Sequence, residues 1–151
     1  MIEEIDRARA AGDSIGGAFQ VVARGVPPGL GSHRQWDERL SARLMAGLGS
    51  IPSIRAVAIG AGMDAAAARG SGFHDPIDYD PSTRRFVRPT NHAGGIEGGM
   101  SNGEEIRVRV EVKPLSTLPR PLRSVDLVTK EAFEAQVERT DVSAIAAAGV
   151  I

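Results

Sequence analysis

A glycine-rich segment that runs directly into a strictly alternating one constrains the fold more than any other feature. Five of the ten residues from Gly94 to Gly103 are glycine, and glycine reaches backbone conformations that other residues avoid. In Glu104–Lys113, isoleucine and valine then alternate with charged side chains, which is the period of a strand that buries one face. The pattern predicts a tight turn that leads into a half-buried antiparallel strand.

The remaining segments predict a mixture of helices and strands. Helices are expected at Ile2–Ala11, at Trp36–Leu48, where large apolar residues recur every four positions, and from Thr140 onward, with Thr140 as the N-cap. Strands are expected at residues 18–26, 54–62, 124–128 and 132–138. Two segments rich in proline and glycine are expected to be loops, residues 25–32 and 70–95. Together these patterns predict an α+β fold.

Composition and charge exclude several classes of protein. A chain of 151 residues that is 42% hydrophobic has enough apolar material for one domain, and residues 1–151 are expected to form a single, incomplete one. A formal net charge of −1 disfavours a general nucleic-acid binder. Because cysteine is absent, disulfides, thiolate nucleophiles and cysteine zinc sites are excluded. The charged N-terminus and short apolar runs fit neither a membrane span nor a signal peptide, so a cytoplasmic location is expected.

The chain is expected to be a piece of a longer protein. Its first predicted helix lacks an N-cap residue other than Met1, and its last one ends on an apolar run without a C-cap.

Individual candidate residues leave alternatives open when each is considered alone. The spacing of the glycine-rich segment is not that of a dinucleotide fingerprint, because a strand follows it where a helix N-terminus is required. The sequence KPLST, Lys113–Thr117, places a cation and two hydroxyls at a strand end, which suits a phosphate but also fits a solvated surface. Arg139 and Asp141 could form a structural ion pair or act as an anion clamp and a positioned acid. The three histidines are not spaced like metal ligands, and no metal site is expected.

Four longer segments, taken in order, resemble chorismate synthase: GVPPGLGS, HAGGIEGGMSNGEEI, VKPLSTLPRPLRSVD and VERTDVSAIAAAGV. The resemblance implies part of a β-α-β sandwich with antiparallel strands packed on helices, assembled as a homotetramer. It also implies a lyase of the shikimate pathway, which makes aromatic amino acid precursors. Such an enzyme converts 5-enolpyruvylshikimate 3-phosphate to chorismate and phosphate in an anti 1,4-elimination that requires reduced FMN.

The resemblance also assigns roles to particular residues. Gly98 matches a glycine that the flavin approaches closely, Arg139 a flavin or substrate arginine, and Asp141 an aspartate that assists proton transfer. The flavin segment of the family corresponds to Lys113, Pro114, Leu115, Ser116 and Thr117. Pro52 and Ser53 match positions whose backbone lies near the flavin, although the family more often has a polar residue followed by alanine there.

The chain matches only the middle and later part of the family sequence. The segments that carry both catalytic histidines of the family have no counterpart here, and His92 matches neither. We therefore expect these 151 residues to be inactive alone. The alternative hypothesis is a non-catalytic structural or oligomerising piece that binds neither flavin nor substrate.

Overall fold

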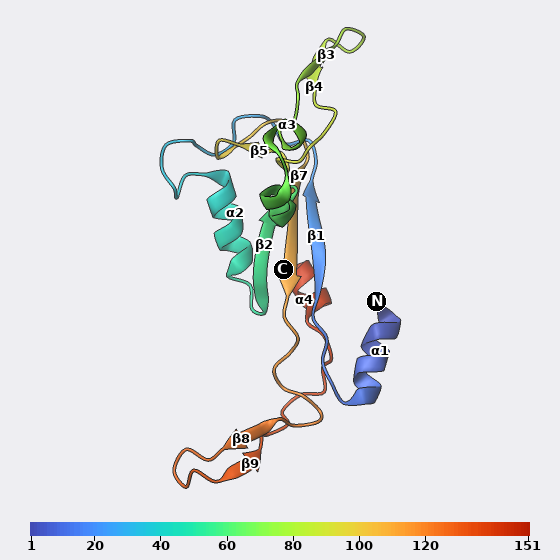
Figure 1. Ribbon diagram of the computed structural model, residues 1–151, viewed down its shortest axis with the longest axis vertical. Coiled ribbons are helices and arrows are strands. Elements are labelled where there is room, and N and C mark those ends of the chain that lie inside the picture. Colours follow the sequence, from blue (N-terminus) through green and yellow to red (C-terminus); the bar gives the residue numbers. More distant parts are fainter. The chain divides into compact units, whose positions relative to one another are not determined.

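The computed structural model describes all residues from 1 to 151, and they divide into two compact units. Unit 1 comprises Met1–Ala18, Pro52–Arg55 and Glu111–Ile151, whereas unit 2 comprises Phe19–Ile51 and Ala56–Val110. The prediction of a single domain over residues 1–151 stays a prediction. Figure 1 labels most of the helices and strands.

One three-stranded sheet is formed by strands that lie far apart in the sequence. It consists of β1 (Gly17–Ala23), β7 (Ile106–Val112) and β2 (Ile54–Ile59), with β7 between the other two (Figure 1). The Lys113 amide donates to the Ser53 carbonyl at one end, and the Gly60 amide donates to the Arg107 carbonyl at the other. Residue numbers therefore increase along β2 in the direction in which they decrease along β7, so the two strands are antiparallel.

Strand β7 provides most of the buried apolar side chains. Ile106, Val108, Val110 and Val112 are 8%, 3%, 0% and 5% exposed, while the charged residues between them are exposed. The predicted alternation of this strand is therefore confirmed. The hydrophobic effect places the apolar face of β7 inward. A shift of its pairing by one residue would bury the charged side chains instead, so the alternation also fixes the register.

Unit 1 also contains two helices and a hairpin. They are α1 (Ile2–Ala11), α4 (Ile145–Val150), and the antiparallel pair β8 (Arg123–Val125) and β9 (Ala132–Glu134). Helix α1 ends as predicted at Gly12, whose left-handed φ of 69° allows the following amides to reach the last carbonyls. Strands β8 and β9 lie where strands were predicted, but both are shorter.

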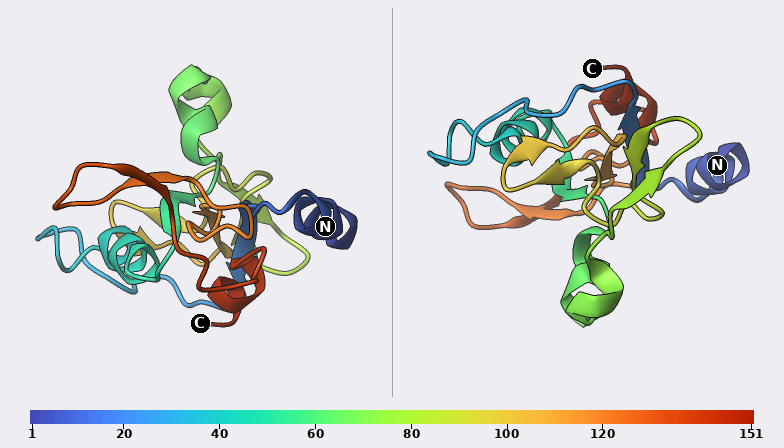
Figure 2. Two further views of the ribbon diagram at one scale, coloured as in Figure 1. Left: turned by 90° about the horizontal axis from the view of Figure 1, so that it is seen from below. Right: turned by 90° about the horizontal axis from the view of Figure 1, so that it is seen from above.

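Unit 2 contains most of the short elements. They are α2 (Leu40–Gly49), the 3-10 helix η1 (Gly62–Ala67), α3 (Gly70–Phe73), β3 (Asp78–Asp80), β4 (Arg85–Val87), β5 (Ile96–Glu97) and β6 (Met100–Ser101). Strands β3 and β4 form one antiparallel hairpin, and β5 and β6 another. Figure 2 shows η1 standing clear of α2 in both views, and Met63 of η1 is 87% exposed.

The structure corrects three of the sequence predictions. Helix α2 begins at Leu40 instead of Trp36, because Arg39 is extended and the Leu40 amide donates to the Gly99 carbonyl. Thr140 does not cap the last helix: α4 begins at Ile145, since the Val142 carbonyl accepts the Ile15 amide and residues 140–143 are not helical. The predicted loop at residues 70–95 contains α3 and the β3–β4 hairpin, whose elements are too short to show a period.

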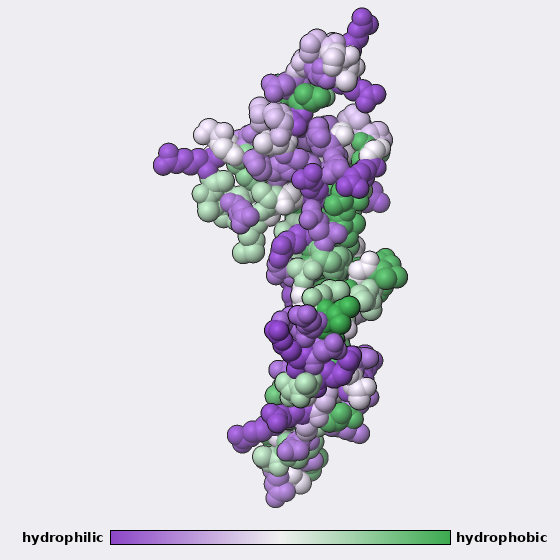
Figure 3. All heavy atoms as spheres, turned by 90° about the vertical axis from the view of Figure 1, so that its right-hand side faces the viewer, coloured by the Kyte–Doolittle hydropathy of each residue, from purple (hydrophilic) through white to green (hydrophobic).

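Some apolar surface remains exposed. Val21 and Val22 are neighbours on β1 and are 44% and 38% exposed. Because successive strand residues point to opposite faces, neither face of β1 is fully covered at this point. Figure 3 shows hydrophobic residues at the surface beside hydrophilic ones on the face drawn. None of the helices combines the length and the apolar character needed to cross a lipid bilayer.

Candidate functional site

Most of the sequence-predicted site residues line one hollow of unit 1. Its volume is about 290 Å³, and we call it the Lys113 hollow. Its lining residues are Ser53, Lys113, Leu115, Ser116, Thr117, Glu138 and Arg139. The structure therefore brings together residues that lie more than 80 positions apart in the sequence.

The backbone around Lys113 is fixed on two sides. The Lys113 amide donates to the Ser53 carbonyl at 2.8 Å, and Ser53 itself has a φ of 74°, which is uncommon for a residue other than glycine. Pro114 then offers no amide hydrogen, so the ladder of β7 ends there. The Leu115 carbonyl accepts the Ser14 hydroxyl at 2.6 Å. These contacts hold the KPLST segment in a defined path at the end of the strand.

The charges of the Lys113 hollow favour an anion. Neither Lys113 nor Arg139 forms an ion pair within the chain. The Glu138 carboxylate also lines the hollow, so the three charged side chains sum to one positive charge. Ser116 and Thr117 add two hydroxyl donors. Two free cations and two hydroxyls suit a phosphate or a carboxylate group.

Asp141 does not share this hollow. It lines a separate one of about 590 Å³ in unit 1, together with Ile5, Arg9, Pro119, Thr140, Val142 and Ser143. Arg139 and Asp141 also form no ion pair, so the structural alternative considered for them is not realised. Pro52 is exposed and lines none of the three hollows described here, although it precedes Ser53.

Gly98 belongs to unit 2 and forms the tip of the β5–β6 hairpin. Its φ is 59°, and no heavy atom lies within 4 Å of the position that a Cβ would take. A ligand can therefore approach the backbone at Gly98 directly. Gly98 lines a third hollow of about 600 Å³, which includes Arg39, His74, Asp75 and His92.

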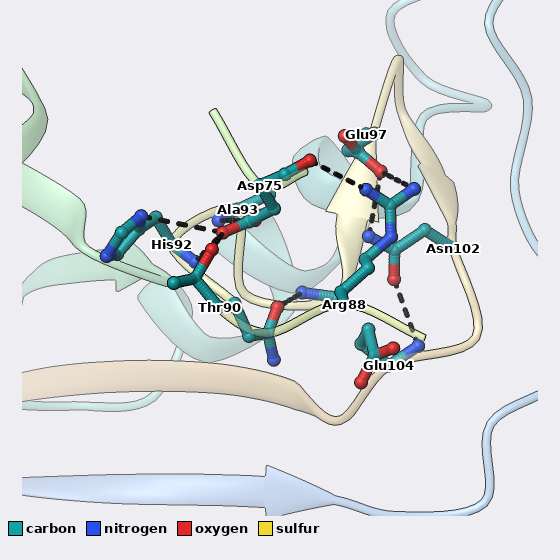
Figure 4. Close-up of polar contacts among 10 residues, drawn as sticks. Asp75, Arg88, Thr90, His92, Ala93, Glu97, Asn102 and Glu104 are labelled. Atoms are coloured by element: carbon teal, nitrogen blue, oxygen red, sulfur yellow. Dashed lines mark hydrogen bonds and ion pairs between the residues drawn. The ribbon is translucent and has the colours of Figure 1, made fainter. Parts of the chain in front are cut away.

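Sequence reasoning missed a buried carboxylate beside this third hollow. The Asp75 side chain is 0% exposed and accepts the Thr90 hydroxyl at 2.6 Å, the His92 amide at 2.8 Å and the Ala93 amide at 2.9 Å (Figure 4). Burial alone raises the pKa of Asp75, but these three hydrogen bonds outweigh burial and leave the pKa below its usual value. The ionised carboxylate thereby fixes the segment that leads to Gly94.

The contacts of Asp75 continue toward Gly98. The Asp75 carbonyl accepts Nη1 of Arg88 at 3.3 Å, and Nη2 of Arg88 pairs with Glu97, the residue before Gly98, at 2.7 Å (Figure 4). Nδ1 of His92 lies 3.5 Å from the same carboxylate, and in the tautomer that carries its proton at Nδ1 it donates to the Phe73 carbonyl at 2.9 Å. In the sequence, the only trace of this network is an aspartate before Pro76, since partners 13–18 residues away follow no local period.

Comparisons with known proteins identify the family. The family model described as "Chorismate synthase" matches residues 1–151. The chain is 54% identical to chorismate synthase of Geotalea daltonii and 55% identical to that of Geobacter sulfurreducens, in each case over 97% of this chain and 39% of the relative. It is 54% identical to the enzyme of Desulforudis audaxviator over 100% of this chain and 38% of that one. The chain thus spans about two fifths of the length of these relatives.

A solved structure agrees with the sequence comparisons. A chain titled "Crystal Structure of Chorismate Synthase" superposes with a TM-score of 0.71 at 44% sequence identity, over 76% of this chain and 34% of that one. The expected fold, helices combined with an antiparallel sheet, is therefore confirmed as part of the fold of that structure. Because the family model matches from the first residue to the last, this chain belongs to the chorismate synthase family.

Proposed function

We propose that the chain contributes to the conversion of 5-enolpyruvylshikimate 3-phosphate to chorismate and phosphate. In this anti 1,4-elimination, the bond between a ring carbon and the phosphate oxygen breaks, a ring proton leaves, and a second ring double bond forms. Family membership over all 151 residues supports the reaction class. The observation that carries the assignment of residues is the Lys113 hollow, where two unpaired cations and two hydroxyls meet.

The residues present fit reduced FMN as the cofactor. The donors of the Lys113 hollow match an anionic ligand with polar ring edges, and the open backbone at Gly98 allows the close approach that a flat ring requires. We therefore propose that Lys113, Ser116, Thr117 and Arg139 of unit 1 hold the flavin. For Gly98 of unit 2 we propose separately, from the family resemblance, that its open backbone accepts the close approach of a flavin. When bound, the reduced flavin supplies electron density to the breaking bond between carbon and oxygen.

We propose separate roles in the reaction for particular side chains and backbone segments of the two hollows in unit 1. Lys113 and Arg139 offset negative charge, which is more effective where ligands exclude water from the hollow. Pro114 and Leu115 set the path of the segment, and Ser53 secures it through its carbonyl. Asp141 is proposed to assist proton transfer, from a hollow of its own that also contains Thr140 and Ser143.

We also propose assembly of the complete protein into a homotetramer in the cytoplasm. The exposed apolar side chains of β1, Val21 and Val22, support an assembled state, because such side chains gain free energy when a partner covers them.

The test is a fluorescence titration of the 151-residue chain with FMN, with and without 5-enolpyruvylshikimate 3-phosphate. Binding is the right measurement because the chain spans about two fifths of its relatives. Loss of one charge-assisted hydrogen bond costs about 1.5–3 kcal/mol, so Lys113→Ala and Arg139→Ala are each expected to raise Kd by about 10- to 150-fold. Lys130→Ala and Arg123→Ala remove matched cations outside the hollow and should leave Kd unchanged.

Two results would contradict the proposal. Equal losses in the control variants would mean that general positive charge, and not the hollow, attracts the ligand. Absence of saturable binding by the folded chain would favour the alternative of a structural piece that binds neither flavin nor substrate.

A further inference from the structure

The turn that carries Gly98 is a two-residue hairpin loop. Ile96 pairs with Ser101 and Glu97 with Met100, so Gly98 and Gly99 form the loop between β5 and β6. Their φ values of 59° and 88° are those of a type I′ turn, in which both central residues have positive φ. The turn is asymmetric: a Cβ on Gly99 would meet the Ser32 carbonyl at 2.7 Å, whereas one on Gly98 would meet nothing within 4 Å. Gly99 thus faces the protein and Gly98 faces open space.

Such a hairpin needs external support. Each strand has only two residues, and even longer isolated hairpins are marginally stable in water. On the β6 side, the Gly99 carbonyl accepts the Leu40 amide at 2.8 Å, and the Ser101 hydroxyl donates to the Pro27 carbonyl at 2.7 Å. On the β5 side, support comes from the Glu97 carboxylate, which accepts Nδ2 of Asn102 at 2.8 Å and pairs with Arg88 at 2.7 Å.

Arg88 connects the β5 side to Asp75, a buried polar residue of unit 2. Its side chain is only 14% exposed, which is unusual for arginine. One nitrogen binds the carbonyl of Asp75, whose own side chain is 0% exposed, and the other pairs with Glu97 (Figure 4). A planar guanidinium held at two points has little freedom to move. The position of Glu97, and with it that of Gly98, is thereby tied to Asp75.

We propose that Arg88 is a positioning residue for the Gly98–Gly99 turn, which it holds through Glu97 against the segment of Asp75. The part that Gly98 plays toward flavin rests on the proposed function. The bracing of the turn by Arg88 does not, and the two are tested separately.

The first experiment measures residue-resolved amide hydrogen exchange in the 151-residue chain. Arg88→Gln is compared with Arg85→Gln, the same change on an exposed arginine of β4. We expect exchange at Asn102, whose amide donates to the Gly95 carbonyl, to become at least tenfold faster in Arg88→Gln and less than twofold faster in the control. Exchange within β7 should not change.

Equal exchange at Asn102 in both variants would overturn the proposal. An equal rise across β7 and the turn would do so as well, because Arg88 would then support the unit as a whole. If Arg88→Gln does not fold, Arg88→Lys decides, because lysine keeps the charge but lacks the two separate nitrogens that reach Asp75 and Glu97. Faster exchange confined to the turn supports the positioning role, and unchanged exchange refutes it.

The second experiment compares FMN affinity in two variants that change charge in opposite directions. If Arg88 positions the turn through Glu97, Arg88→Gln and Glu97→Ala should both raise the Kd for FMN at least fivefold and leave the urea midpoints unchanged, because each variant releases the turn. Charge balance alone predicts that Glu97→Ala lowers Kd, since it removes a carboxylate beside an anionic ligand, and this result would refute the brace. Flavin binding that persists at wild-type strength in both variants would refute the positioning role while leaving the proposed function intact. Absence of binding by the unmodified chain would count against the proposed function alone, because hydrogen exchange still decides the brace.

Discussion

Replacing Asp75 by asparagine tests how much one buried carboxylate stabilises unit 2. Oδ1 of Asp75 accepts the Thr90 hydroxyl and the His92 amide, and Oδ2 accepts the Ala93 amide at 2.9 Å. Asparagine keeps one acceptor oxygen but places an NH₂ group where Oδ2 was. The Ala93 amide would then face another donor in a site from which water is excluded.

The expected loss follows from these three contacts. An unsatisfied buried donor costs about 1–3 kcal/mol, and each remaining hydrogen bond weakens when its acceptor loses the charge. The cost is partly offset because a neutral amide is easier to bury than a carboxylate. We therefore expect Asp75→Asn to lower the free energy of unfolding at pH 7 by about 2–4 kcal/mol, which corresponds to a fall in Tm of about 5–15 °C for a chain of this size.

The pH dependence gives the prediction a second readout. The pKa of Asp75 is lowered in the folded chain, so the unfolded state binds its proton first as the pH falls. The stabilisation by Asp75 is fully present above the unfolded pKa of about 3.9, and it is lost as the pH falls through the folded pKa. The difference in stability between the two chains should therefore shrink below about pH 4.

Urea unfolding followed by circular dichroism, at pH values between 7 and 3, measures both effects. Asp78→Asn is the matched control, because Asp78 is exposed on β3 and should change the free energy by less than about 0.5 kcal/mol. A loss below about 1 kcal/mol for Asp75→Asn, or a difference that stays constant with pH, would mean that the ionised Asp75 carboxylate does not stabilise unit 2.

Three further predictions concern single residues. Gly31→Ala should destabilise the chain by at least about 1 kcal/mol more than Gly29→Ala. Both glycines have a φ above 90°, but only a Cβ on Gly31 would meet a neighbour, the Gly99 carbonyl at 2.6 Å. Equal urea midpoints of the two variants would contradict this. Hydrogen bonds from the side chains of Ser82 and Thr83 lower the pKa of Asp80 to about 2, so its carboxyl carbon should titrate near that pH by NMR, and an ordinary value would be inconsistent with the turn. Val110→Ala removes methyl groups from a side chain that is 0% exposed, and it should lower the free energy of unfolding, measured with urea, by about 2 kcal/mol. A loss below about 0.5 kcal/mol would mean that β7 does not anchor the core.

The sequence predicted the elements whose stability is local. Strand β7 alternates over seven residues, each apolar one is buried, and no other element has to be known to recognise it. Helix α1 likewise ends at a glycine that adopts the left-handed conformation. Pro114 marks the end of β7 in the same way. A regular period followed by an end signal makes a segment predictable from its own residues.

Tertiary hydrogen bonds explain the predictions that were wrong. The four-residue spacing from Trp36 does not begin a helix there, because the Leu40 amide is bound by Gly99 and Arg39 remains extended. Thr140 has the right type for an N-cap, but the Val142 carbonyl accepts the distant Ile15 amide. Such contacts join residues 59 and 127 positions apart, and a single sequence carries no local signal of them.

Some residues of the candidate site could be predicted from the sequence, and others could not. The residues from Lys113 to Thr117 could be named because they resemble a family segment, and most of them line one hollow together with Arg139. The network of Asp75, Arg88 and Glu97 could not be named, because it depends on the folding of residues 70–95 into short elements without a period. Asp141 could be named, but its separation from the Lys113 hollow could not be foreseen.

Chemical-shift mapping of the ¹⁵N-labelled chain with FMN shows whether the Lys113 hollow binds the flavin, because it locates the ligand and detects its binding in the same titration. Saturable shifts are expected at the amides of Ser53, Lys113, Leu115, Ser116, Thr117 and Arg139, with smaller changes at Gly98. Shifts confined to other segments, such as the β3–β4 hairpin, or no shifts at all from a folded chain, would contradict the assignment of the Lys113 hollow as the anion-binding site.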